Sequence, residues 1–159
     1  MLLFKLIGAI LLGLSGGMIA YELNKNATRA LLQTEAFCRL LNHIRSQVEC
    51  FALPIVDILS TADIELLREC GYTGKDAPTS LSKLYEGTHW RDSRTEMIIR
   101  RFSDEFGKSY RAEQVGRCSY YLSLLEERKR TAERELPAKK KLYLTLCTSA
   151  SLAVLILFL

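Results

Sequence analysis

The residues that most often carry chemistry are few in this chain and are not arranged as a site. The two histidines, His43 and His89, stand far apart, and neither belongs to a His-x-x-x-His or Glu-x-x-His pair. No Gly-Lys-Ser/Thr phosphate-binding loop occurs. The cysteines lack the Cys-x-x-Cys spacing of zinc and redox sites; they are Cys38, Cys50, Cys70, Cys118 and Cys147. We therefore expect no enzyme activity, no metal and no cofactor.

Two positions have a functional alternative. Trp90, with Arg91 and Arg94 beside it, has the residue types of a nucleic-acid stacking site, but one aromatic next to two arginines is more commonly a packing cluster at the start of a helix. His43 lies next to an apolar stripe, where a histidine is ordinarily a surface or half-buried residue. We favour the packing interpretation for both.

The charged residues are sorted along the chain. Of 22 Lys and Arg residues only Lys5 falls outside residues 22–141, and every Asp and Glu falls inside that range. A helix rises about 1.5 Å per residue, so the apolar ends are just long enough to cross a hydrocarbon core of about 30 Å. The pattern predicts a transmembrane helix over residues 1–21, a cytoplasmic helical domain over 22–141 and a second transmembrane helix over 142–159.

The basic residues next to the two ends give the expected orientation. They are Lys25, Arg29, Lys139, Lys140 and Lys141. Because positive residues accumulate on the cytoplasmic flank of a span, they place the domain in the cytoplasm and both termini outside. The alternative is a cleaved secretory signal ending near Ser15-Gly16-Gly17. The odd number of cysteines favours a reducing compartment and therefore the first interpretation.

Small residues recur every four positions in the first predicted span. Ala9, Gly13 and Gly17 share this spacing, which lets a second transmembrane helix approach closely. Ordinary glycine content of a membrane helix is the alternative.

The middle of the chain has a helical pattern throughout. Apolar residues at three- and four-residue spacing predict one buried stripe of Leu40, Leu41, Ile44, Val48 and Phe51, on a helix that continues from the first span. Pro54 predicts a break and a restart. Asp63 is expected to cap a short helix that stops at Gly71, and the boundaries between Ser60 and Trp90 are the least defined.

Two further helices are expected after that segment. Ser93 and Glu96 have capping-box spacing, which predicts a helix from about Ser93 to Phe106, with Gly107 as its stop. The last helix is expected to begin at Ser109 or Tyr110, to bury one apolar face, and to reach the second span through Pro137. The fold class is therefore all-α: a small bundle of five to six helices flanked by an N-terminal and a C-terminal transmembrane helix.

Several segments together resemble stage III sporulation protein AB of endospore-forming bacteria. They are Leu40-Leu41-Asn42-His43-Ile44-Arg45-Ser46-Gln47-Val48, Pro54-Ile55-Val56-Asp57-Ile58-Leu59, Phe106-Gly107-Lys108-Ser109-Tyr110-Arg111-Ala112-Glu113-Gln114 and Glu135-Leu136-Pro137-Ala138-Lys139-Lys140-Lys141-Leu142-Tyr143. The resemblance covers both ends and most of the chain. Tyr110 stands where the family usually has an acidic residue, and residues 60–90 match poorly.

The resemblance implies a function without catalysis. The family's cytoplasmic domain is similar to the helical F domains of type II secretion and type IV pilus platform proteins. It implies a protein of the mother-cell membrane around the forespore, in the channel joining the two cells, that couples the companion stage III AA ATPase to the other channel proteins. A membrane-anchored helical signalling or assembly adaptor is the alternative, and self-association stays open.

Charged residues near the helix turns are the expected partner contacts. The candidates are Glu35, Arg45, Glu49, Asp57 and Glu113. Taken singly, each is more commonly a solvated surface charge that contributes little.

Overall fold

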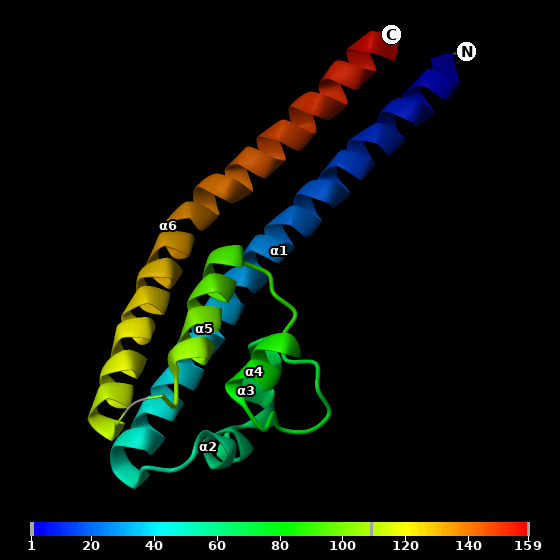
Figure 1. Cartoon of the computed structure of the whole chain (residues 1–159). Coiled ribbons are helices and arrows are strands. Elements are labelled where there is room, and N and C mark those ends of the chain that lie inside the picture. The colour runs from blue at the N-terminus through cyan, green and yellow to red at the C-terminus, as the bar shows by residue number, and fades with distance from the viewer. Residues whose placement is uncertain (1, 109, 159) are drawn as a thin grey trace. The chain divides into compact units, whose positions relative to one another are not determined.

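Six α-helices make up the described part of the chain (Figure 1). The computed structural model describes residues 2–108 and 110–158, and it describes no side chain at 1–16, 109, 151, 154–155 or 157–159. The helices are α1 (Leu2–Phe51), α2 (Ile55–Thr61), α3 (Ile64–Glu69), α4 (Leu81–Glu86), α5 (Ser93–Glu105) and α6 (Arg111–Phe158). In these residues the only β-type pairing is an isolated bridge between Tyr72 and Thr88. The predicted all-α class is confirmed.

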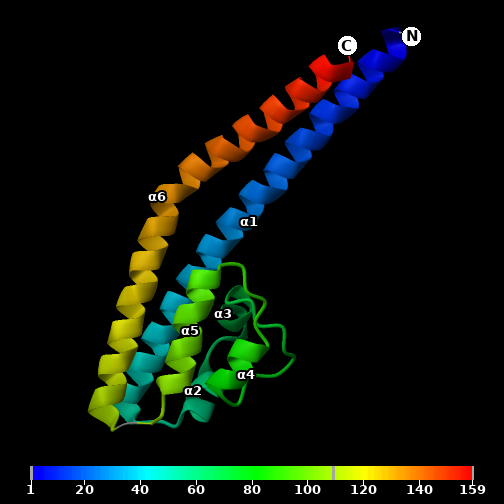
Figure 2. The ribbon, with the colours of Figure 1, turned by 45° about the horizontal axis from the view of Figure 1, so that its top comes forward.

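The chain divides into two compact units, and each long helix contributes to both. Unit 1 consists of Met1–Arg29 and Ala132–Leu159, and unit 2 is Ala30–Thr131. In unit 1 the two helical segments run side by side in opposite directions (Figures 1 and 2). Ala20 is buried there, whereas Gly17 has no atom within 4 Å of the place a β-carbon would occupy. Ala9 and Gly13 lie outside the described side chains, so close packing at these small residues stays a prediction.

The two predicted membrane spans are not supported by the described residues. Within that part of the chain, none of the helices has both the length and the apolar character needed to cross a membrane. Most of the first predicted span, residues 1–16, and several residues of the second lie outside the side-chain description.

Unit 2 has one hydrophobic core, to which every helix contributes. The predicted stripe of α1 is buried from Leu40 to Val48, and Ile58 and Leu59 of α2 pack into the same core. The other helices supply Leu67 and Cys70, Leu81 and Leu84, Ile99 and Phe102, and Cys118, Tyr121 and Leu125. Phe51 departs from the prediction: it is 68% exposed and is the last residue of α1.

The helix ends follow the predicted residues with one correction. Asp63 caps α3 by accepting a hydrogen bond from the Glu65 amide, at 3.0 Å, and Gly71 has the positive φ of 93° that favours glycine. α5 spans Ser93–Glu105, but its N-cap is Asp92 rather than Ser93, since the Asp92 carboxylate accepts from the Thr95 amide.

The ends of α6 also differ slightly from the expectation. The helix begins at Arg111, one or two residues later than predicted, after Gly107 with its φ of 83°. It continues without a break through Pro137, a residue that supplies no backbone N–H to the helix.

Candidate functional site

Four of the five predicted partner residues lie at one end of unit 2. This is the end where α1 stops, α2 begins and α6 begins (Figures 1 and 2). Arg45 pairs with Glu49 at 3.8 Å, one turn apart on α1, and Asp57 is exposed in the first turn of α2. Glu113 pairs with Arg117 at 2.8 Å in the first turns of α6. The structure therefore places these four residues toward the same end of unit 2.

Glu35 lies elsewhere. It is 14 residues before Glu49 on the same helix, which is roughly 21 Å along the axis. Its carboxylate accepts a hydrogen bond from the Lys129 ammonium of α6, at 3.1 Å, and both side chains are partly buried. Glu35 thus holds two helices of unit 2 together, and its distance from the other candidates separates it from their surface.

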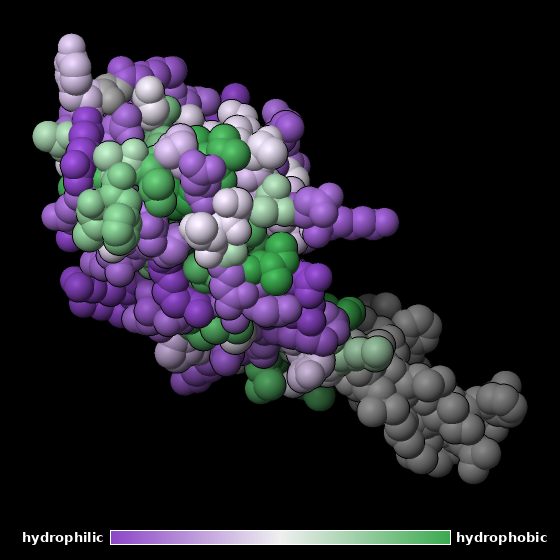
Figure 3. Space-filling view, turned by 90° about the horizontal axis from the view of Figure 1, so that it is seen from below, coloured by the Kyte–Doolittle hydropathy of each residue, from purple (hydrophilic) through white to green (hydrophobic). Residues whose placement is uncertain are grey.

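Three exposed apolar side chains occupy the same end, and the sequence analysis did not predict any of them as a partner contact. Phe51 is 68% exposed, Tyr110 is 91% exposed, and Val56 of α2 is also exposed. Figure 3 views the molecule from below Figure 1 and shows green apolar side chains breaking up a hydrophilic surface. We call the set Arg45, Glu49, Phe51, Val56, Asp57, Tyr110 and Glu113 the turn-end surface.

Arg111 fixes the geometry of the turn-end surface. Its guanidinium donates from Nε to the Val48 carbonyl, at 3.0 Å, and from Nη2 to the Glu49 carbonyl. The last carbonyls of a helix have no partner inside the helix, so this side chain satisfies them and joins the start of α6 to the end of α1. Ala52 follows with a φ of 52°, the left-handed conformation that ends many helices but that costs a non-glycine residue about 1 kcal/mol. The backbone at the end of α1 is therefore fixed by hydrogen bonds and includes one residue, Ala52, in an unfavourable conformation.

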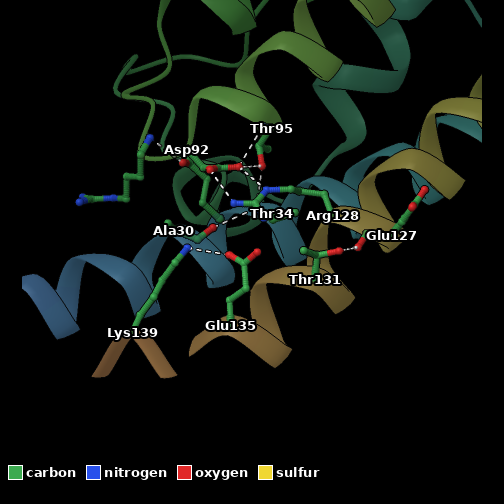
Figure 4. Close-up of polar contacts among 11 residues, drawn as sticks. Ala30, Thr34, Asp92, Thr95, Glu127, Arg128, Thr131, Glu135 and Lys139 are labelled. Atoms are coloured by element: carbon green, nitrogen blue, oxygen red, sulfur yellow. Dashed lines mark hydrogen bonds and ion pairs between the residues drawn. The ribbon is translucent and has the colours of Figure 1, made fainter. Parts of the chain in front are cut away.

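A partly buried polar network lies between α1, α5 and α6 (Figure 4). The Asp92 carboxylate accepts two hydrogen bonds from the Arg128 guanidinium, at 2.8 and 2.9 Å. It also accepts from the amide of Thr95, at 3.0 Å, and from its hydroxyl, at 2.7 Å. The Thr95 hydroxyl lies 2.8 Å from that of Thr34 on α1. One carboxylate therefore caps α5 and ties it to both long helices.

The environment of Asp92 keeps it ionised. Burial by itself raises the pKa of this carboxyl, but the hydrogen bonds from Arg128 and Thr95 outweigh burial and hold the pKa at about 2. The side chains of Asp92 and Arg128 are only 15% and 13% exposed, so the pair is shielded from solvent. In the sequence, Asp92 stands directly before Ser93 and is therefore a second candidate N-cap of α5, which the sequence analysis did not consider.

Gln33 makes a second buried connection, between α1 and the long loop that contains α4. Its side-chain amide donates to the carbonyls of Cys70 (2.7 Å) and His89 (2.8 Å), and its carbonyl accepts from the Arg91 amide (3.0 Å). Gly71 lies against it, since a β-carbon at that position would stand 2.5 Å from the Gln33 amide nitrogen. Sequence reasoning gave no indication of this clamp, because its partners are 37 to 58 residues away along the chain.

The remaining chemically active residues are part of the packing. The indole of Trp90 stacks on Phe37 with ring centroids 5.2 Å apart, which confirms the packing interpretation. Burial raises the pKa of the Cys38 thiol and of the Cys118 thiol to about 11 in each case. His43 is half-buried, as expected, and its Nε2 has no hydrogen-bond partner in the described part of the chain. Among the described residues, no three His, Cys, Asp or Glu side chains are grouped so as to hold a metal ion.

Comparison with known proteins gives one match. The model of the family described as stage III sporulation protein AB matches residues 5–159, nearly the whole length of the chain. No curated protein and no solved structure matches.

Proposed function

Because the chain belongs to the stage III sporulation protein AB family, we propose that it is a non-catalytic platform component of the channel between mother cell and forespore. In this proposal it couples a cytoplasmic stage III AA-type ATPase to the other channel proteins. The observation that carries the proposal is the family match over residues 5–159, which includes both apolar ends and the helical domain between them.

The proposal places the protein at the mother-cell membrane, with unit 2 in the cytoplasm and both termini outside. Support comes from the residues of unit 1 whose side chains are described: the large apolar ones are exposed on α1 and α6. On α6 they point in several directions around the helix, which suits a surrounding lipid phase better than one partner stripe. They are Met18, Ile19, Leu142, Leu144, Leu146, Leu152 and Ile156.

Single cysteines placed at positions 1 and 159 test this topology. In a chain whose own cysteines are replaced, a membrane-impermeant maleimide should label both positions only from outside the mother-cell membrane. Labelling of either position from the cytoplasmic side contradicts the orientation, and full labelling from both sides in carbonate-washed membranes contradicts membrane insertion.

The turn-end surface is the proposed ATPase contact. It combines three exposed apolar side chains with charged residues, as the centres and rims of protein interfaces do. Its backbone is fixed by Arg111, so little ordering entropy is lost when a partner binds. α1 and α6, which meet at this surface, also contribute to unit 1, so each helix connects the surface covalently to the proposed membrane segments.

Charge reversal tests the contact. Asp57→Lys and Glu49→Lys should each lower co-purification of the ATPase and the number of heat-resistant spores, and Phe51→Ser should do so most strongly. Glu86→Lys is the matched control, an exposed acidic residue on α4 away from this surface, and it should leave both readouts unchanged. Normal co-purification across the whole turn-end set would contradict the proposed coupling and favour the adaptor alternative.

A further inference from the structure

The exposed face of α5 carries three arginines that have no ion-pair partner among the described residues. Arg94, Arg100 and Arg101 are exposed and stand three or four residues from the exposed Met97, so the four lie on one side of the helix, away from the buried Ile99 and Phe102. Asp104 and Glu105 are exposed acidic side chains on the same side, and Glu105 pairs with Arg117 of α6 at 3.3 Å. We call Arg94, Met97, Arg100 and Arg101 the α5 arginine face.

Most other arginines of unit 2 are neutralised, which makes this face stand out. In the part of the chain that the structure describes, no carboxylate lies within ion-pair distance of Arg94, Arg100 or Arg101. By contrast, a carboxylate partner is present for Arg39, Arg45, Arg68, Arg117 and Arg128. Like charges on one helix face repel each other and lower helix stability slightly, and a contact with an acidic partner would offset this repulsion.

The composition of the face indicates what kind of partner would compensate it. Protein interfaces are enriched in arginine and methionine and depleted in lysine, and all the cations of this face are arginines around a Met97 that is 55% exposed. Arginine binds carboxylates in a bidentate geometry that lysine cannot provide. A single-stranded nucleic acid would typically use an aromatic platform for base stacking as well, and the nearest candidate, Trp90, is already stacked on Phe37.

We propose that the α5 arginine face binds an acidic helix of a partner protein, one that presents Glu or Asp side chains around an apolar residue that contacts Met97. This surface lies on a different helix from the turn-end surface, and its partner is defined by charge rather than by the ATPase assignment. The proposal therefore goes beyond the proposed function and can fail or succeed independently of it.

A synthetic helical peptide with glutamates at three- and four-residue spacing around a central leucine is the probe. We expect it to bind the full chain in neutral detergent with an affinity that falls as NaCl is raised, and a peptide with Gln in place of Glu should not bind. The double variant Arg94→Glu/Arg101→Glu should weaken binding at least about tenfold, because each reversal replaces an attraction with a repulsion. Met97→Ser should weaken it several-fold.

Arg68→Glu is the matched control, an exposed arginine on α3 that already has Glu65 as its partner, and it should bind the peptide like the unchanged chain. In sporulating cells, the double variant should lower spore counts at least about tenfold while ATPase co-purification stays normal. Equal weakening by Arg68→Glu would overturn the proposal. So would arginine-dependent binding to phosphatidylglycerol vesicles without peptide binding, which would assign the face to a lipid surface.

Discussion

Replacing Asp92 by asparagine removes one negative charge from the network between α1, α5 and α6 while keeping a residue that can cap a helix. The carboxyl has a pKa of about 2 in the folded chain against an ordinary value of 3.8. At about 1.36 kcal/mol for each pKa unit, this difference corresponds to at most ~2.4 kcal/mol of stability at neutral pH. The remaining exposure of the pair lowers the expected loss to about 1.5–2 kcal/mol.

The loss should depend on pH in a defined direction. Because the folded pKa lies below the ordinary one, the ionised carboxylate stabilises the fold above about pH 4, and this stabilisation disappears as the pH falls through 2. The Asp92→Asn chain should therefore melt about 3–8 °C lower than the unchanged chain at pH 7, and the difference should close between pH 4 and pH 2.

Thermal unfolding of the full chain in neutral detergent, followed by circular dichroism, measures both effects. Asp63→Asn is the matched control, since Asp63 also caps a helix but is exposed and, among the described residues, has no cation partner on another helix. It should cost less than about 0.5 kcal/mol. An Asp92→Asn loss no larger than the control, or a loss that is unchanged down to pH 2, would refute the assignment of stability to the Asp92–Arg128 contact.

Two other substitution and labelling experiments follow from the same structure. Gly71→Ala should lower the free energy of unfolding, measured in urea, by well above 1 kcal/mol, because it adds a clash with Gln33 to the strain of a positive φ. Gly107→Ala has the same strain without the clash and should lower it by about 1 kcal/mol. Cys50 is exposed and should react with a thiol reagent within minutes in the native chain, while Cys70, whose pKa is raised by burial, should react only after unfolding. Equal losses at the two glycines, or fast labelling of Cys70, would contradict these expectations.

Local patterns predicted much of unit 2, because they depend on neighbouring residues. The stripe from Leu40 to Val48, the cap at Asp63 and the stop at Gly71 each follow from spacing or from the backbone preference of one residue. Phe51 fits the same stripe, yet it is exposed, because periodicity does not show where the packing partner ends.

The connections between distant segments were not predictable in the same way. The bond from Arg111 to the end of α1 and the pairing of Arg128 with Asp92 join residues 36 to 63 positions apart. Such contacts depend on the tertiary arrangement, and no local pattern encodes them. Four of the predicted partner residues were placed together by this arrangement, while Glu35 was placed against Lys129.

The Gln33 clamp also bears on which parts of this protein are free to vary. All three of its contacts are to backbone atoms, the carbonyls of Cys70 and His89 and the amide of Arg91. A side chain that recognises only backbone does not restrict the identity of the residues it holds. Substitutions, and even insertions, in the intervening loop are therefore compatible with the same attachment. In an evolving family, Gln33 and Gly71 should therefore change more slowly than the rest of the loop between Cys70 and Arg91.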